Sequence, residues 1–275
     1  MSLVARLREL WAYRDLIANL VARDLKVRYK NSLLGVLWSL LNPLLMMLVF
    51  TFVFQILAGS SELPAYPAFI LSGVLAWNLF SASVTGATNS IVGNAHLIKK
   101  VYFPREALPI SVVLSNLVNY LLALPVYFVL ALALGLNPTG WILFLPAVIL
   151  VQLTFTLGIS FILTTANVFY RDTQIVMEVV LLAWFFLTPV FYPISQVAPQ
   201  GVQIGGLVLS SFDAQRWLRI LNPMASIVAS YRDVLYWGVQ PGLDFFVRTA
   251  VTAFIFLVVG YVIFLRFSPV FGEEI

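Results

Sequence analysis

The sequence predicts an all-α, polytopic membrane protein with six transmembrane helices. Hydrophobic residues make up 61% of the 275-residue chain and charged residues only 10%, a balance typical of membrane proteins and not of water-soluble domains. The charges are also clustered, so that uncharged stretches of span length alternate with short basic ones. Because a helix needs about 20 predominantly apolar residues to cross a bilayer core, each long uncharged stretch predicts one or two spans.

Residues 1–30 are predicted to form a cytoplasmic amphipathic helix at the membrane interface, ahead of a six-span domain over residues 31–275. Spacings of three, four or seven residues place apolar side chains on one face of this helix: Leu3, Leu7, Leu10, Ile17, Val21 and Leu25. The alternative is a helix that packs on a partner protein. Its basic end runs directly into an uncharged stretch, where the first span is expected at about Leu33–Leu57.

The other five spans follow from the remaining uncharged stretches. A turn-rich break at residues 135–140, GLNPTG, divides the longest stretch into two helices. The spans are expected at about Tyr66–Thr88, Ala107–Leu134, Trp141–Phe169, Gln174–Tyr192 and Arg248–Phe267.

Basic residues indicate the orientation of these spans. The N-terminal segment, residues 99–105 and the turn at Arg171 carry Lys or Arg, whereas the connections around Ser60 and Asn137 carry none. Positively charged connections remain on the cytoplasmic side. The sequence therefore predicts a multi-pass protein with both termini in the cytoplasm.

Residues 195–244 are predicted to include two short re-entrant helices on the external side. Asn222 and Pro223 have the residue types of a helix start, and Gly238 has that of a helix end. The enclosed segment is too short and too polar to span a bilayer. Asp213–Leu221 is the second short segment. A loop that lies on the membrane surface is the alternative.

The sequence contains no recognisable catalytic, nucleotide-binding or metal-binding motif. It lacks the G-x-x-x-x-G-K-[ST] pattern of a phosphate-binding loop, it has no cysteine, and His96 is its single histidine. Glu178 is the sole acidic residue in a predicted span, close to the cytoplasmic edge. We therefore expect no catalytic site, no metal and no cofactor in this chain, and no nucleic-acid binding. Transport energy would then come from a partner, or the chain would be a passive conduit.

The cytoplasmic loop over residues 93–105 is the best candidate for docking such a partner. A short apolar helix face beside two lysines suits a groove in another protein. The residues concerned are His96, Leu97, Ile98, Lys99, Lys100, Val101, Tyr102 and Phe103. The alternative is a loop whose lysines bind lipid headgroups and only set the topology.

Five stretches carry a resemblance to a known family. They are RDLKVRYKNSLLGVLWSLLNPLL from residue 23, LIKKVYFPRE from 97, NVFYRD from 167, FFLTPVFYP from 185 and LNPMASIVASYRDVLYWG from 221. In this order they resemble the membrane subunit, or permease, of bacterial ABC exporters for O-antigen and teichoic-acid polysaccharides.

The resemblance implies the partners and the setting of the chain. It implies a homodimer in the bacterial inner membrane, with two copies of a separate cytoplasmic ATPase that hold ATP and Mg²⁺. It also implies that the N-terminal helix and the 93–105 loop, as a coupling helix, contact the ATPase. The expected cargo is a polysaccharide linked to undecaprenyl diphosphate, which passes through a channel formed largely by spans one and five.

Particular residues are expected to serve this route. Helical spacings of three and four residues place one set on one face of span one and another on one face of span five. These residues, Trp38, Asn42 and Phe52 in span one and Phe185 and Tyr192 in span five, would line the channel, since aromatic rings can stack on sugar faces. Alternatively, these aromatic side chains face lipid or pack between helices.

Basic and external residues complete the expected route. Arg28 and Lys30 would attract the diphosphate at the cytoplasmic entrance, or would only anchor the helix. Under the resemblance, the external helices would form an outer gate with Trp217, Tyr231 and Arg232.

Three rival functions share part of this pattern. They are an exporter of teichoic acid, an exporter of a small hydrophobic drug or lipid, and a non-transporting membrane scaffold for glycan assembly. A scaffold would neither need nor stimulate an ATPase.

Overall fold

The computed structural model describes residues 3–30, 35, 37–57, 63–197, 202–204 and 207–275. It is a helical bundle with one antiparallel two-stranded hairpin, β1 (Val202–Ile204) and β2 (Leu207–Leu209). The α-helices are α1 (Leu3–Ala12), α2 (Arg14–Tyr29), α3 (Leu37–Phe50), α4 (Tyr66–Thr88), α5 (Ala95–Lys100), α6 (Ala107–Ala133), α7 (Leu145–Phe169), α8 (Thr173–Leu187), α9 (Ser211–Leu221), α10 (Pro223–Arg232), α11 (Leu243–Phe267) and α12 (Phe271–Glu274).

Short helices of other types extend or connect these elements. Two are π-helices that continue α3 and α10, namely η1 (Thr51–Leu57) and η5 (Asp233–Trp237). The others are 3₁₀ helices: η2 (Val92–Asn94), η3 (Gly140–Phe144), η4 (Ile194–Gln196) and η6 (Ser268–Val270).

Five helices are long and apolar enough to cross a membrane, which confirms a multi-pass helical membrane protein. The second predicted span matches α4 from end to end, and the third and fourth agree within one residue at each end. The five candidate spans are Leu37–Leu57, Tyr66–Thr88, Ala107–Ala133, Gly140–Phe169 and Leu243–Glu274. Part of the predicted first span, residues 33–34 and 36, lies outside the described residues.

The predicted fifth span is wrong at its C-terminal end. Helix α8 ends at Leu187 and contains 15 residues, which gives a length of about 22 Å. Thr188 already has an extended backbone, because the ring of Pro189 disfavours helical geometry in the preceding residue. The apolar run to Tyr192 therefore continues as a turn. Similarly, the last long helix begins at Leu243, five residues before the predicted start.

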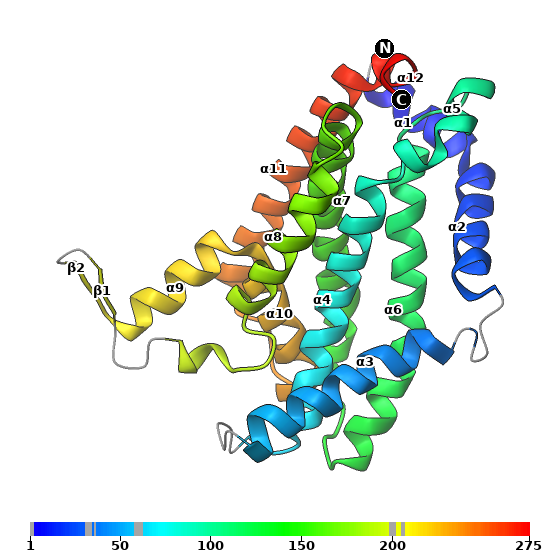
Figure 1. The fold of residues 1–275 in the computed structure, drawn as a ribbon. Coiled ribbons are helices and arrows are strands. Elements are labelled where there is room, and N and C mark those ends of the chain that lie inside the picture. Colours follow the sequence, from blue (N-terminus) through cyan, green and yellow to red (C-terminus); the bar gives the residue numbers. More distant parts are fainter. Residues whose placement is uncertain (1–2, 31–34, 36, 58–62, 198–201, 205–206) are drawn as a thin grey trace.

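The N-terminal segment also differs from the single interfacial helix expected over residues 1–30. It forms α1 and α2, which meet at Tyr13, and α2 lies alongside α6 with its axis along the bundle (Figure 1). Leu20 of α2 is buried in an apolar cluster with Ile91 and Phe264. This burial, together with polar contacts described below, holds α2 against the bundle.

The bundle is built around α4, and most of its side chains are buried. Helices α4, α6, α7 and α11 run side by side, while α3 crosses them obliquely near one end (Figure 1). Helices α1, α5 and α12 lie together at the other end, here called the terminal end. The closest crossing joins α7 to α11, where Gly158 and Gly260 bring the two backbones into contact.

Helices α9 and α10 form an inverted V beside α8 (Figure 1). At its apex, Asn222 caps α10 by accepting a hydrogen bond from the Ala225 amide, and its side-chain amide donates to Leu187 O and Thr188 Oγ1. At the foot of α10 and η5, Gly238 has a left-handed φ of 63°. The predicted start and end of this helix are thereby confirmed, although its last turn is a π-helix.

Candidate functional site

A groove of about 1010 Å³ lies between α3, α4, α6 and α8, with the end of α2 at its edge. Its surface is mainly apolar, with amide and charged side chains at intervals. The lining includes Arg28, Trp38, Asn42, Phe50, Trp77, Asn78, Asn116, Asn119, Tyr120, Glu178 and Phe185.

The predicted entrance residue Arg28 lies at this groove, where Asn116 fixes its position. Arg28 Nη1 donates a hydrogen bond to Asn116 Oδ1 over 2.9 Å. Asn116 is buried in the third turn of α6, and its own amide donates to Val112 O over 3.0 Å. Lys30 is exposed and does not line the groove. The structure therefore separates Arg28 from Lys30, which the sequence analysis placed together at the entrance.

Three of the five predicted lining residues, Trp38, Asn42 and Phe185, border the groove. Phe52 and Tyr192 do not. Phe52 follows the start of the π-helix η1, whose wider turn rotates it away from the face of Trp38 and Asn42. Tyr192 follows the break at the end of α8, so the helical spacing assumed for it does not apply.

Sequence reasoning missed most of the polar groove residues. Asn78, Asn116, Asn119 and Tyr120 were not singled out, whereas Glu178 was placed on the same face of span five as Phe185. The available signal was the presence of three asparagines within otherwise apolar spans, since intramembrane polar residues usually face a protein interior or cavity. The sequence did not indicate that they converge on one groove.

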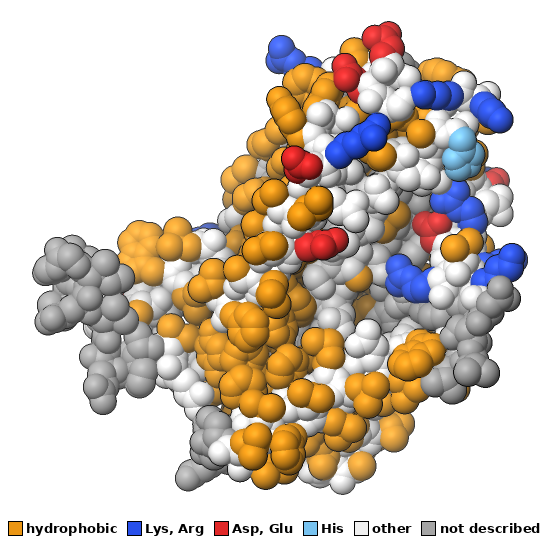
Figure 2. All heavy atoms as spheres, in the orientation of Figure 1, with side chains coloured by type: hydrophobic (Ala, Val, Ile, Leu, Met, Phe, Trp, Pro, Cys, Tyr) orange, Lys and Arg blue, Asp and Glu red, His pale blue; other side chains and the backbone are white. Residues whose placement is uncertain are grey.

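The predicted docking segment is only partly helical. Helix α5 ends at Lys100, and Val101 begins an extended stretch with φ −130° and ψ 133°. Tyr102 is 88% exposed, whereas Ile98 and Phe103 pack against the apolar cluster at the terminal end. Val101, Tyr102 and Phe103 therefore do not belong to a coupling helix. Lys and Arg side chains gather on this end of the molecule (Figure 2).

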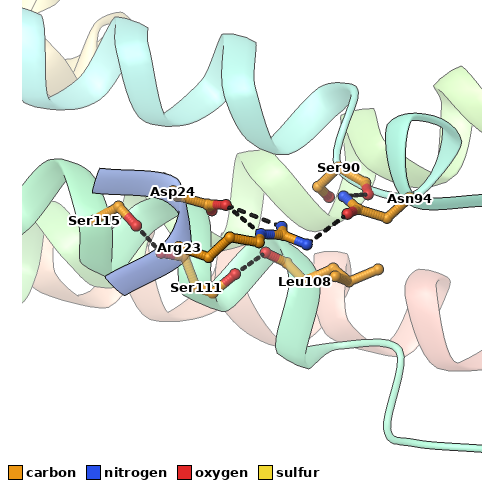
Figure 3. A network of polar contacts seen from close by, with 7 residues as sticks. All are labelled: Arg23, Asp24, Ser90, Asn94, Leu108, Ser111 and Ser115. Atoms are coloured by element: carbon orange, nitrogen blue, oxygen red, sulfur yellow. Dashed lines mark hydrogen bonds and ion pairs between the residues drawn. The ribbon is translucent and has the colours of Figure 1, made fainter. Parts of the chain in front are cut away.

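A polar chain links α2 to the segment before α5 (Figure 3). Arg23 forms an ion pair with Asp24, with Nη2 and Oδ1 2.9 Å apart, and Arg23 Nη1 donates to Asn94 Oδ1 over 3.0 Å. Asn94 in turn donates to Ser90 O over 2.8 Å. Arg23 and Arg28 thus connect α2 to the docking segment and to the groove, respectively.

The three residues predicted for an outer gate do not meet. Tyr231 and Arg232 are buried inside the bundle, and Trp217 is half-exposed on α9. The Tyr231 ring packs against Tyr120, with centroids 5.8 Å apart. Arg232 binds the turn after α8, as discussed below. Tyr231 and Arg232 are therefore part of the packed interior of the bundle.

Comparison with known proteins identifies the family of the chain. The model of the ABC-2 type transporter family matches residues 15–236. The chain is 38% identical to the O-antigen export system permease protein RfbA of Myxococcus xanthus, over 99% of this chain and 100% of that protein. It is 32% identical to RfbA of Klebsiella pneumoniae over 94% of each chain, and 24% identical to the polysialic acid transport protein KpsM of Escherichia coli over 81% and 80%. The chain therefore belongs to the ABC-2 type transporter family.

Proposed function

We propose that the chain is the permease subunit of an ATP-driven exporter that carries an undecaprenyl-diphosphate-linked polysaccharide, of the O-antigen type, across the bacterial cytoplasmic membrane. The observation that carries this proposal is the end-to-end likeness to an O-antigen export permease. The groove supports it, because its aromatic and amide side chains suit sugar rings and hydroxyl groups, and its apolar walls suit an isoprenoid chain.

The proposed topology has six spans, with the terminal end in the cytoplasm. The five candidate spans are joined by α8 as a shorter sixth, completed by the turn that follows it. The basic side chains at the terminal end support this orientation. Helices α9 and α10 would then enter and leave the membrane from the outer side as a re-entrant pair.

Energy for transport would come from two cytoplasmic ATPase subunits bound to a homodimer of this chain. The sequence contains no phosphate-binding loop of the ATPase kind, so ATP and Mg²⁺ would be held by the partner. Helix α2 offers a route for coupling, since it contacts Asn94 before α5 through Arg23 and Asn116 at the groove through Arg28. A shift of the docking segment would thereby move the entrance arginine.

Replacing Tyr102 by alanine is expected to lower the amount of ATPase that co-purifies with the chain by about tenfold. The side chain is 88% exposed, and truncating an aromatic anchor at an interface typically removes 1–2 kcal/mol or more of binding energy, about tenfold in affinity. The measurement is quantitative affinity purification from native membranes in mild detergent.

Leu143→Ala is the matched control, because Leu143 is also 88% exposed but lies in η3, away from the docking segment. It should retain the ATPase at the wild-type level. Wild-type recovery of the ATPase with Tyr102→Ala would refute the docking assignment. Absence of any ATPase from the wild-type preparation would argue against the exporter and favour a scaffold.

Replacing Arg28 by glutamine is expected to weaken binding of undecaprenyl diphosphate by about tenfold. The change removes a charged donor at the groove, worth roughly 1.5 kcal/mol or more. Lys30→Gln is the control, since Lys30 lies outside the groove. Retained lipid can be counted by native mass spectrometry. Equal losses in the two variants would indicate general attraction by positive charge and not a site at Arg28.

A further inference from the structure

We infer that Arg219 and Arg248 form a second anion site, between α9, α10 and α11, that binds the phosphate of a lipid headgroup. Its assignment to the outer half of the membrane rests on the topology proposed above. This site lies at a different part of the fold from the groove at Arg28 and accounts for two arginines that the transport route does not otherwise use.

The fold brings the two arginines together on one aromatic ring. Arg219 lies in the last turn of α9, and Arg248 lies in the second turn of α11. Their guanidinium carbons are 4.8 Å and 5.7 Å from the centroid of the Phe245 ring. Arg248 Nη2 also donates to Arg219 O over 3.0 Å. Both side chains are half-buried, so their positions are set by packing.

The charge of this pair is not neutralised by a close carboxylate. The ion pairs within the described ranges join Arg6 to Glu106, Arg14 to Asp15 and Arg23 to Asp24, all in the N-terminal helices or at the terminal end.

Two acidic residues lie nearby without pairing. Asp233 is near enough to attract Arg219 electrostatically. Asp244 lies one turn before Arg248 and is exposed. Neither approaches an arginine nitrogen within 4.0 Å in the described structure. Two like charges beside one ring repel each other, and a bound anion would remove that repulsion.

The position of the pair suits a lipid phosphate. Arg248 follows the start of α11 by five residues, a rise of about 8 Å, and it contacts the last turn of α9 through Arg219 O. Helix α9 extends outward from the bundle (Figure 1) and carries exposed apolar side chains, among them Trp217 at 50% and Leu221 at 76% exposure. Tryptophan and arginine are typical of the boundary between headgroups and hydrocarbon.

Phosphate is the ligand that this geometry favours. A guanidinium group offers planar, charged donors that match phosphate oxygens, often two at a time. In the described structure, one donor of the pair has a protein acceptor, Arg219 O. The phosphate can belong to a bilayer phospholipid or to the diphosphate of an exported lipid-linked glycan. In the second case the site would hold the carrier after it has crossed the membrane.

The test uses the full-length chain with its ATPase in maltoside detergent, which contains no phosphate. Arg28→Gln serves as the background, so that the groove does not contribute. Phosphatidylglycerol and undecaprenyl diphosphate are added separately, and bound lipid is counted by native mass spectrometry. Adding Arg219→Gln and Arg248→Gln is expected to lower binding of at least one lipid by about tenfold.

Arg216→Gln is the matched control, because Arg216 is an exposed arginine one turn earlier on α9, and it should change binding less than twofold. Loss of both lipids supports a general phosphate site, and loss of the diphosphate alone supports a carrier site. Wild-type binding of both lipids by the double variant overturns the proposal.

A variant that is expected to gain binding tests the site independently, in case the double variant fails to fold. Asp233→Asn removes the negative charge that attracts Arg219 and is expected to strengthen binding severalfold, provided both arginines are present. No increase, or a decrease, would count against the site. If Arg219-dependent binding of phosphatidylglycerol persists while undecaprenyl diphosphate never binds, the anion site stands and the proposed carrier lipid is wrong.

Discussion

Gly260→Val is expected to lower the apparent unfolding temperature by at least about 6 °C, or to prevent accumulation of folded protein. A Cβ atom at Gly260 would collide with the Gly158 carbonyl, and one at Gly158 would lie 2.5 Å from Leu257 N and 2.6 Å from Phe256 O. These neighbours are backbone atoms, so they cannot move aside as a side chain can. Overpacking typically costs about 1–3 kcal/mol and occasionally more, and a collision with backbone belongs at or above the upper end of this range. Each kcal/mol shifts the midpoint by about 2–4 °C in a chain of this size, so about 3 kcal/mol corresponds to at least about 6 °C.

The same crossing explains why the effect should be global. Helices α7 and α11 share the most extensive contact between helices in the bundle. Within a bilayer, close approach of backbones at small residues is a main source of helix association. Thermal unfolding in detergent, followed by size-exclusion chromatography, measures the change. Gly140→Val is the control, since a Cβ there meets no atom within 4 Å. Equal midpoints for the two variants would contradict the close crossing.

Arg232→Met is expected to destabilise the chain by roughly 3 kcal/mol and to reduce export more than tenfold. Arg232 is 4% exposed and donates hydrogen bonds to Pro189 O, Val190 O and Tyr192 O. Its guanidinium carbon lies 3.6 Å from the centroid of the Phe69 ring. Methionine fills similar space but donates no hydrogen bond. A buried carbonyl left without a donor costs about 1–3 kcal/mol, partly offset because a buried charge is removed.

The expected loss of export follows from where Arg232 binds. The guanidinium group of Arg232 binds three carbonyl groups of the turn after α8 and so helps to fix its path, together with the hydrogen bond that Tyr66 Oη donates to Phe191 O. Gly73 makes room for this contact, because a Cβ there would lie 2.9 Å from both Arg232 Nη2 and Val190 O.

Export of surface polysaccharide and thermal unfolding should be measured together. Arg232→Lys, which keeps a charged donor, should recover part of both quantities. Arg266→Met is the control, as Arg266 is exposed at the end of α11. Wild-type stability and export in Arg232→Met would remove the proposed role of this side chain.

The sequence predicted most helices because hydrophobic length is a local property. Tyr66–Thr88 was placed without error, and the start of α10 was located from Asn222 and Pro223. The end of α8 was also encoded, by Pro189, but the apolar run beyond it hid this signal. The end of α5 at Lys100 had no comparable marker in the sequence. Helix ends without proline, glycine or a capping residue depend on contacts that the neighbouring residues do not reveal.

Site residues were predicted less well because a site depends on which helix faces meet. Arg28 borders the groove, and charge beside a span can be read from the sequence, while its role at an entrance stays a prediction. Its hydrogen-bond partner Asn116 was not predicted, because 88 residues separate the two in the sequence. Phe52 was assigned by ideal helical spacing, which the π-helix η1 alters.

The sequence by itself determined that this chain crosses a membrane several times and which stretches do so, because the free energy of transfer into lipid adds up along each segment. Only the tertiary structure decided which faces pack together. Close packing at Gly158 and Gly260, and the shared ring of Arg219 and Arg248, join residues far apart in the chain. Such contacts depend on shape complementarity between helices, which no property of a single segment specifies.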